Sequence, residues 1–492
     1  MIERGKRMEY QSTRNAGYRA DSVQAVLEGI APDGGLYIAD PAEIPFDWQS
    51  VLRCSAREMS ARILQALLPD FPDMRGLVEK AYERKFETED LTPLVQVGDR
   101  YVLELFRGPT SAFKDVALSV LPQLVTAGRS LEGAEGDVVI LTATSGDTGK
   151  AALEGFHDVP GTRIVVFYPY KGVSRVQELQ MSTQKGKNVR VCAVRGNFDD
   201  AQTGVKKIFA ACSGRDLGGK TLSSANSINI GRLAPQVMYY FKAYADLLAA
   251  GRIGMGEEVC FVVPTGNFGD ILAGYYARRL GLPVGRLVCA SNQNNVLTDF
   301  IRTGVYDRRR EFYKTNSPSM DILVSSNLER LLFLLCRNGE KVADYMRRLS
   351  EEGVYTVEKE LLTELQSDFA CGCCDDEASL RTIGEVFRQY GYLMDPHTAV
   401  AWNVSGQVQE TVGGMPMVVL STASPYKFPT ACLKALGGSP DEDEFAVMRQ
   451  LREISGMPIP RNLAGLQEEP VLHTDVIGKE DMLDYVLRYL AE

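Results

Sequence analysis

The chain has 492 residues, enough for roughly two to four structural units that each bury a core. Its 45% hydrophobic and 24% charged residues are typical of globular proteins, and its net charge of -10 argues against a nucleic-acid surface. A small anionic substrate would therefore need a local basic pocket. No segment approaches the roughly 18 apolar residues of a membrane span, and the N-terminus lacks the apolar segment of a secretory signal.

Residues 1–98 are expected to form an N-terminal region, with helical periodicity at 21–30 and 55–68. From residue 101 the pattern changes to short apolar strands followed by glycine-rich turns and helices. The strands are predicted at 101–106, 137–144, 163–168, 189–194, 259–265, 286–291 and 417–423. This alternation is typical of an α/β fold with a parallel sheet covered on both faces, in which ligands bind at the carboxyl ends of the strands.

The α/β region is expected to span residues 99–435 and to hold two subdomains. Within it, residues 305–395 are richer in charge and are predicted to be mostly helical, as an insertion or a cap. Residues 436–492 are expected to form a C-terminal helical segment.

Lys114 lies in the segment RGPTSAFKDVAL (107–118), between a Gly-Pro-Thr turn and a helix expected to begin at Val116. Burial disfavours the ammonium form of a lysine, and a neutral amine is a nucleophile toward aldehydes. For any single lysine, an ordinary surface position is the more common outcome. The interpretation of Lys114 as a nucleophile therefore depends on the other segments.

Two strand-to-helix turns carry small and polar residues that suit an anion. The turn TSGDTG (144–149) offers hydroxyls and amides at a helix N-terminus, although such a turn is often only an N-cap. The turn TGNFGD (265–270) has glycines that let backbone amides approach a phosphate, although a plain helix start explains it equally well. It matches neither the Walker loop nor the dinucleotide-binding fingerprint.

Three further positions are candidates for a site. Arg232 ends the segment SSANSINIGR (223–232), and its guanidinium suits bidentate binding of a phosphate; a surface arginine is the alternative. Thr422 follows the last predicted strand, so its hydroxyl is expected at the strand ends. His397 is one of three histidines, and helix capping or packing is the favoured interpretation.

The ten cysteines are mostly scattered, as expected for reduced thiols in a cytoplasmic enzyme. Cys371, Cys373 and Cys374 form one cluster. A zinc-type site needs about four ligands, and no second cysteine pair accompanies this one. We therefore expect an exposed loop there and no metal.

Taken together, these segments resemble the threonine synthases, pyridoxal-phosphate enzymes of the tryptophan-synthase-β fold group. The resemblance implies an α/β protein of fold type II, with two doubly wound sheet domains and an extra N-terminal region. The matching segments follow the family's order: GGLY (34–37), GPTSAFKD (108–115), TATSGDTGKAAL (142–153), VSRVQELQM (173–181), GNFDDAQ (196–202), SANSINIGR (224–232), VPTGNFGD (263–270), MDILVSSNLERLL (320–332), DPHTAV (395–400) and STASPYKFP (421–429).

The resemblance implies which residues hold pyridoxal 5′-phosphate. Lys114 matches the Schiff-base lysine, and Thr422 matches the residue whose hydroxyl faces the pyridine nitrogen. The loop that binds the 5′-phosphate through backbone amides is matched by Gly266, Asn267, Phe268 and Gly269.

The resemblance also implies which residues hold the substrate. Ser145, Asp147 and Thr148 match the loop that binds the α-carboxylate and lies beside the ring's 3-oxygen, and Thr148 is predicted to be catalytic together with Lys114. The substrate phosphate is matched to Asn226, Ser227 and Arg232.

Two positions depart from the wider pattern. Many relatives in the fold group have Asn at position 147, and an acid near a carboxylate is unfavourable. Asp147 is therefore expected to point at a backbone amide or at the ring hydroxyl. Tyr170 interrupts the usual run of a proline, a basic residue and a glycine, which leaves the role of Lys171 open.

The implied reaction converts O-phospho-L-homoserine and water to L-threonine and phosphate, the last step of threonine biosynthesis, with Lys114 as acid and base. The alternatives are a phospho-lyase that yields 2-oxobutyrate, a hydroxy-amino-acid dehydratase, and a cofactor-binding protein without turnover. A dehydratase would not need the segment 223–232, and a protein without turnover would be expected to lose Lys114. We expect a cytoplasmic protein, monomeric or homodimeric, with no nucleic-acid or membrane partner.

Overall fold

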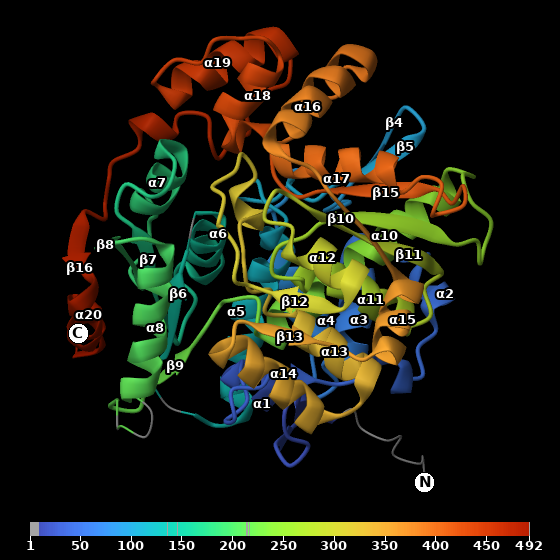
Figure 1. The fold of residues 1–492 in the computed structure, drawn as a ribbon. Helices are drawn as coiled ribbons and strands as arrows, with labels where there is room; N and C mark the ends of the chain where they lie inside the picture. Colours follow the sequence, from blue (N-terminus) through green and yellow to red (C-terminus); the bar gives the residue numbers. More distant parts are fainter. Residues whose placement is uncertain (1–8, 135, 145, 213–214, 216, 492) are drawn as a thin grey trace.

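The computed structural model describes residues 9–134, 136–144, 146–212, 215 and 217–491 (Figure 1). Its framework is two sheets with helices packed on both faces. The larger sheet has the strand order β14-β11-β10-β15-β5-β4, and the smaller has the order β16-β8-β7-β6-β9. Among the described strands of these sheets, β4 alone runs antiparallel to its neighbour. The structure is therefore an α/β fold with two parallel sheets, as predicted.

The strands have the following bounds. The larger sheet contains β4 (Leu94–Val97), β5 (Arg100–Glu104), β10 (Val259–Pro264), β11 (Val284–Ser291), β14 (Phe369–Cys373) and β15 (Met417–Ser421). The smaller sheet contains β6 (Val138–Ala143), β7 (Thr162–Pro169), β8 (Val189–Arg195), β9 (Thr221–Ser223) and β16 (Asp475–Gly478). Two minor sheets contain β1 (Tyr10–Ser12), β2 (Arg19–Ala20) and β3 (Tyr37–Ile38), and β12 (Val305–Asp307) and β13 (Val354–Thr356).

Alternating side chains in the larger sheet face two different helix layers. On β10, Phe261 and Val263 belong to the core that includes helices α10 (Val237–Ala249) and α11 (Gly269–Arg279). Cys260 and Val262 belong instead to the core that includes α17 (Pro396–Gln407). A strand that is buried on both faces explains the continuous apolar run in the sequence.

The smaller sheet is also covered on both faces. On β7, Ile164 and Val166 share a core with α6 (Asp147–Phe156). Val165 and Phe167 pack in a separate core with α8 (Phe198–Cys212) and α20 (Met482–Ala491). Figure 1 shows the C-terminal segment with β16 and α20 along the outer edge of this sheet.

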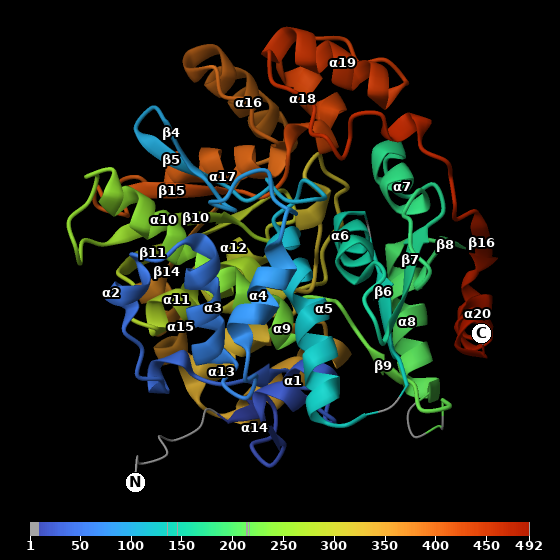
Figure 2. The ribbon, with the colours of Figure 1, turned by 180° about the vertical axis from the view of Figure 1, so that it is seen from behind.

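Helix α5 (Lys114–Leu131) lies beside α6, between the two sheets (Figure 2). Four helices near the N-terminus belong to the core that also contains α10 and α11 on one face of the larger sheet. These are α1 (Ser22–Glu28), α2 (Trp48–Val51), α3 (Ala56–Leu67) and α4 (Met74–Tyr82). The other helices are α7 (Arg175–Ser182), α9 (Ile230–Leu233), α12 (Val296–Thr303), α13 (Leu328–Cys336), α14 (Gly339–Glu351), α15 (Lys359–Asp368), α16 (Asp376–Tyr390), α18 (Pro429–Ala435) and α19 (Glu444–Ser455).

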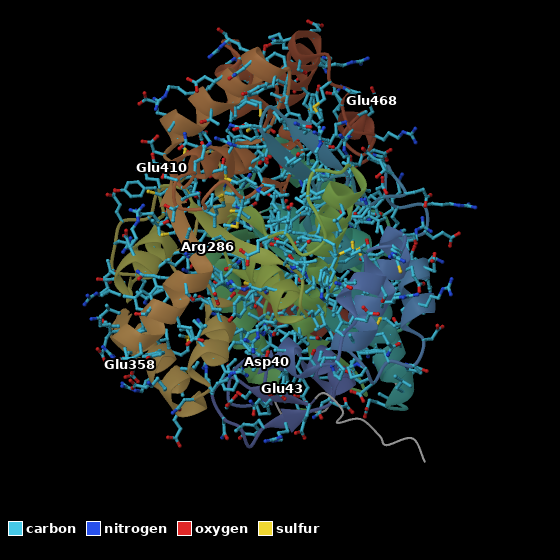
Figure 3. The ribbon with its side chains drawn as sticks, turned by 90° about the vertical axis from the view of Figure 1, so that its right-hand side faces the viewer. Asp40, Glu43, Arg286, Glu358, Glu410 and Glu468 are labelled. Carbon is cyan, nitrogen blue, oxygen red and sulfur yellow. The ribbon has the colours of Figure 1, made fainter. Side chains whose placement is uncertain are left out.

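Asp40 ties the N-terminal region to the rest of the molecule. Its carboxylate accepts hydrogen bonds from Arg279, at 3.0 Å from Nε to Oδ1, and from Arg337. Figure 3 shows it in the lower half of that view, beside Glu43. Because two guanidinium groups converge on one buried carboxylate, α11 and α13 are both anchored to this region.

The seven predicted strands of the α/β region are confirmed as β5, β6, β7, β8, β10, β11 and β15. The helical periodicities at 21–30 and 55–68 correspond to α1 and α3. The segment 305–395 is mostly helical, but it also supplies β14 to the larger sheet, and the C-terminal segment supplies β16 to the smaller one. No helix in the described ranges combines the length and the apolar character that a membrane span requires.

The prediction of an exposed loop at Cys371, Cys373 and Cys374 is wrong. The first two cysteines lie in β14, an edge strand that pairs in parallel with β11, and Cys374 follows it as a buried residue. A Cβ at Gly372 would lie 2.7 Å from Oε1 of Gln407 and 2.8 Å from Cγ1 of Val404, both on α17. The glycine therefore serves the close approach of a helix to the sheet.

Candidate active site

Three helices begin at the ends of strands and turns that hold the predicted site residues. Helix α5 begins at Lys114, α6 at Asp147 and α11 at Gly269. In the described part of the chain, the N-cap residues of these helices make no side-chain cap hydrogen bond, although at α6 the hydroxyl of Thr144 accepts from the amide of Gly149 at 2.8 Å. The free amides and the positive ends of the helix dipoles therefore favour negative groups.

The turn before Lys114 is held in place by Asp115. The carboxylate of Asp115 accepts hydrogen bonds from the amide of Thr110 at 2.8 Å and from its hydroxyl at 2.5 Å. The amide of Phe113 donates to the carbonyl of Thr422 at 2.9 Å. The helix thus starts at Lys114, two residues earlier than predicted. Thr422, the residue expected to face the pyridine nitrogen, lies beside this turn.

Lys114 is partly buried, and four charged groups act on its ammonium group. Burial lowers the pKa of Lys114 from 10.5 to about 8; Lys427 and Arg232 add to this decrease, while Asp147 and Asp270 oppose it. The shift raises the fraction of neutral amine near neutral pH by roughly 300-fold. Lys114 is therefore a better nucleophile and proton acceptor than a surface lysine.

Asp147 forms a buried ion pair that the sequence did not predict. The Nζ atom of Lys427 lies 2.7 Å from Oδ1 of Asp147, and both side chains are buried. Burial alone would raise the pKa of Asp147, but Lys427 and Lys114 outweigh it and hold the pKa well below its usual range. Of the two partners expected for Asp147, the backbone amide is not among its described contacts, because its nearest donor is an ammonium group; the ring hydroxyl stays a prediction.

Two more side chains surround the carboxylate of Asp147. Gln177 donates to Oδ1 at 3.1 Å, and the hydroxyl of Ser319 donates to Oδ2 at 3.5 Å. Ser319 also donates its amide to Nε2 of His397 at 3.1 Å. Segments on the two sheets and in the 305–395 region therefore meet at Asp147.

His397 is held in one tautomer by its two partners. Because the amide of Ser319 can only donate, Nε2 of His397 accepts, and Nδ1 carries the proton that is donated to Asp395 at 2.6 Å. Asp395 also caps α17 by accepting from backbone amides. The packing interpretation of His397 is therefore supported, and the residue fixes the position of Ser319.

The loop 265–270 has a compact backbone at the start of α11. Phe268 takes a left-handed conformation, with φ of 61°, and its ring is buried. A Cβ at Gly266 would lie 2.8 Å from the carbonyl oxygen of Ser319, whereas one at Gly269 would meet Nδ2 of Asn327 at an ordinary 3.4 Å. Gly266 is thus required by the fold, and Gly269 is free to serve a ligand.

The carbonyl of Asn267 accepts from both the amide and the side chain of Asn327, at 3.1 Å each. The side chain of Asn267 itself is exposed. These two bonds tie the loop to the start of α13, so the loop is preorganised.

Arg232 is buried in α9, and it has capacity for a further hydrogen bond. Burial lowers the pKa of Arg232 to about 10, and one Nη donates to the carbonyl of Ala225. Among the described residues, its Nε has no hydrogen-bond partner. A buried guanidinium with an unsatisfied N–H is suited to bind an anion.

Asn226 and Ser227 precede Arg232 and are partly buried. Ser227 lies against the loop, because a Cβ at Gly269 would be 3.8 Å from its Cβ. The guanidinium of Arg330, which is fully buried, donates to the carbonyls of Ile228 at 2.6 Å and Tyr37 at 2.9 Å. The predicted phosphate segment is therefore held by an arginine that its local sequence does not reveal.

Asp270 is a second buried carboxylate, and sequence reasoning did not select it as a site residue. Its Oδ1 accepts from the hydroxyls of Tyr239 and Tyr240, and within the described ranges its Oδ2 has no partner. Burial raises the pKa of Asp270 to about 7. The group can therefore exist in either protonation state near neutral pH.

Among the remaining predicted residues, Thr148 lies in the first turn of α6 and is partly buried. Ser145 lies outside the described residues. Lys171 adopts a left-handed conformation with φ of 60°, and its Nζ lies 5.4 Å from the ring centre of Tyr170. It makes this contact with its neighbour at the end of β7, which assigns it no chemical role.

Two family models match the chain: one described as "Threonine synthase N terminus" over residues 9–82, and one described as "Threonine synthase, C-terminal" over residues 398–480. The threonine synthase of Pseudomonas aeruginosa is 39% identical over 470 residues, which cover 94% of this chain and 97% of that protein. Threonine synthase-like 1 of Homo sapiens is 40% identical over 434 residues, and the matched part is 58% of that protein's length.

Solved structures of threonine synthases superpose over nearly the whole chain. The crystal structure of the pyridoxal-phosphate-bound threonine synthase from Brucella melitensis has a TM-score of 0.85 at 37% identity and covers 98% of both chains. The threonine synthase from yeast has a TM-score of 0.87 at 32% identity and covers 98% of this chain and 99% of that one.

Proposed function

Because the chain belongs to the threonine synthase family, we propose that it converts O-phospho-L-homoserine and water to L-threonine and phosphate, with pyridoxal 5′-phosphate as cofactor. Its α/β fold is fold type II of the pyridoxal-phosphate enzymes. The observation that carries the proposal is the position of Lys114, an amine with a lowered pKa at the start of one helix. At the starts of α6 and α11, the N-cap residues make no side-chain cap hydrogen bond.

The described residues fit the cofactor. The loop 265–270 offers backbone amides at a helix start. An added Cβ at Gly269 would make only ordinary contacts, so the packing of the protein does not require a glycine there. Thr422 lies beside the Lys114 turn, where an uncharged hydroxyl can face the pyridine nitrogen. When bound, pyridoxal phosphate supplies an aldehyde that joins an amine and a ring that delocalises negative charge.

The substrate has an anionic group at each end, and the chain offers a separate site for each. We assign the α-carboxylate to the start of α6, with Ser145 and Thr148, and the phosphate to Arg232 with Asn226 and Ser227. The unsatisfied Nε of Arg232 supports the second assignment. Lys114 is assigned to the movement of protons at the substrate carbons, because its pKa of about 8 lets it both accept and return a proton near neutral pH.

The test is incubation of the cofactor-loaded protein with O-phospho-L-homoserine, with phosphate, threonine and 2-oxobutyrate measured separately. We expect threonine and phosphate in equal amounts from the wild type, and none from Lys114→Ala. Lys434→Ala is the matched control, since Lys434 is an exposed lysine on α18. Activity retained by Lys114→Ala would overturn the role of that residue.

Two alternatives are separated by the same assay. A phospho-lyase would release 2-oxobutyrate as the main product. A hydroxy-amino-acid dehydratase would accept a substrate without phosphate, and a buried arginine with an unsatisfied N–H argues against it.

The remaining proposals concern the whole protein. We propose a cytoplasmic enzyme that is a monomer or a homodimer, with residues 1–98, 99–435 and 436–492 as its three regions. Cell fractionation and sedimentation at several concentrations test the first two proposals, and limited proteolysis tests the region boundaries.

A further inference from the structure

We infer that Lys427 and Asp147 act as one positioning unit that balances charge beside Lys114, so that neither residue can be neutralised alone without changing the chemistry of that amine. The inference rests on the proposed cofactor at Lys114 and deepens it, because it concerns two residues that act through Lys114. Neither residue is proposed to react with the substrate.

The first step of the argument is the place of the pair in the fold. Asp147 starts α6 after β6 of the smaller sheet, and Lys427 follows β15 of the larger sheet. Their 2.7 Å contact therefore joins the strand ends of the two sheets. Lys427 also donates to the carbonyl of Thr110 at 3.1 Å, in the turn that leads to Lys114. One ammonium group thus touches both the acid and the turn that carries the amine.

The second step is burial. Lys427 is 1% exposed and Asp147 is 5% exposed. Removal of one partner from a buried pair leaves an uncompensated charge, which is far more costly than loss of the pair as a whole. Among the described residues, Asp147 would keep Gln177 at 3.1 Å and Ser319 at 3.5 Å as hydrogen-bond partners, and both of these are neutral.

The third step is the sign of each charge at Lys114. Asp147 raises the pKa of Lys114, whereas Lys427 lowers it, so the two effects oppose each other. The other charged groups that act on this amine are Arg232 from α9 and Asp270 from α11. Neutralising Lys427 alone must therefore shift proton affinity at Lys114 upward, and neutralising Asp147 alone must shift it downward.

The experiment compares the holoenzyme with Lys427→Met, with Asp147→Asn and with the double variant. The readout is the pH midpoint of the visible absorption band of the bound cofactor, which reports the proton on the lysine-linked nitrogen and needs no substrate. We expect the two single variants to move the midpoint in opposite directions by about one pH unit, a tenfold change in proton affinity. The double variant should return close to the wild type.

Lys427→Arg is the charge-preserving control, and it should keep the midpoint near that of the wild type. If Lys427→Met does not fold, the double variant, which leaves neither charge of the pair unpaired, and Asp147→Asn still decide the matter; Asp147→Asn keeps Lys427 bonded to the carbonyl of Thr110. Shifts of both single variants in one direction, or unchanged midpoints with lowered melting temperatures, would reduce the pair to a structural contact and overturn the inference.

The outcome is distinguishable from failure of the proposed function. Midpoint shifts of opposite sign in a protein that forms no threonine would support the charge pair and refute the reaction. Threonine formation with unchanged midpoints would support the reaction and refute the charge pair. Failure of every variant and of the wild type to bind the cofactor would refute both.

Discussion

Substitution of two neighbouring glycines should separate what the fold needs from what a ligand needs. At Gly269 an added Cβ would meet Asn327 at 3.4 Å and Ser227 at 3.8 Å, which are ordinary contacts. At Gly266 it would lie 2.8 Å from a backbone carbonyl oxygen, which cannot move without moving residues near Ser319. The protein itself should therefore tolerate Gly269→Ala and resist Gly266→Ala.

The expected magnitudes follow from these contacts. Gly266→Ala should destabilise the cofactor-free protein by about 1–3 kcal/mol, the usual cost of overpacking. Gly269→Ala should leave its melting temperature unchanged or slightly higher, because alanine favours a helix over glycine. If the amides at Gly269 hold a phosphate, a methyl group there should cost one charge-assisted hydrogen bond, and the Kd of pyridoxal phosphate should rise about 10- to 100-fold.

The assay is a titration of cofactor-free protein with pyridoxal phosphate, followed by absorbance, together with thermal melts of each variant. Gly254→Ala is the matched control, because Gly254 is exposed and its added Cβ would come no closer than 3.5 Å to Glu257. A wild-type Kd for Gly269→Ala would refute the phosphate role of the loop. A wild-type melting temperature for Gly266→Ala would refute the steric reasoning.

Two other variables should respond in predictable directions. The rate at which the cofactor-free protein combines with pyridoxal phosphate should rise with pH and level off near the Lys114 pKa of about 8, because only the neutral amine adds to an aldehyde; a rate in stopped-flow experiments that still climbs toward 10.5 would contradict the lowered pKa. Arg232→Ala should raise the KM for O-phospho-L-homoserine by about 10- to 100-fold through loss of a charge-assisted hydrogen bond, and it should change the Kd of the cofactor little. Steady-state kinetics with an unchanged KM would remove Arg232 from the phosphate site.

Much of the fold was predictable because its signals are local. Apolar runs such as 259–265 and 286–291 are strands because both faces are buried, and glycine-rich turns after them mark helix starts. Since parallel strands end at one edge of their sheet, the turns 144–149 and 265–270 were expected at strand ends. The strand β14 was missed because its cysteines and glycine lack the β-branched composition of a strand, and only contact with α17 explains Gly372.

The sequence by itself determined the seven strands of the α/β region, the turn with Lys114 and the order of the segments that resemble the family. Only the tertiary structure decided that Lys427 neutralises Asp147, that His397 holds Ser319, and that Arg330 braces the segment before Arg232. The reason is physical: helix and strand propensities act within a few residues, whereas the partner of a buried charge depends on which distant segments the sheets bring together. A charged residue therefore shows its chemical type in the sequence, but its protonation state is set by neighbours that the sequence does not reveal.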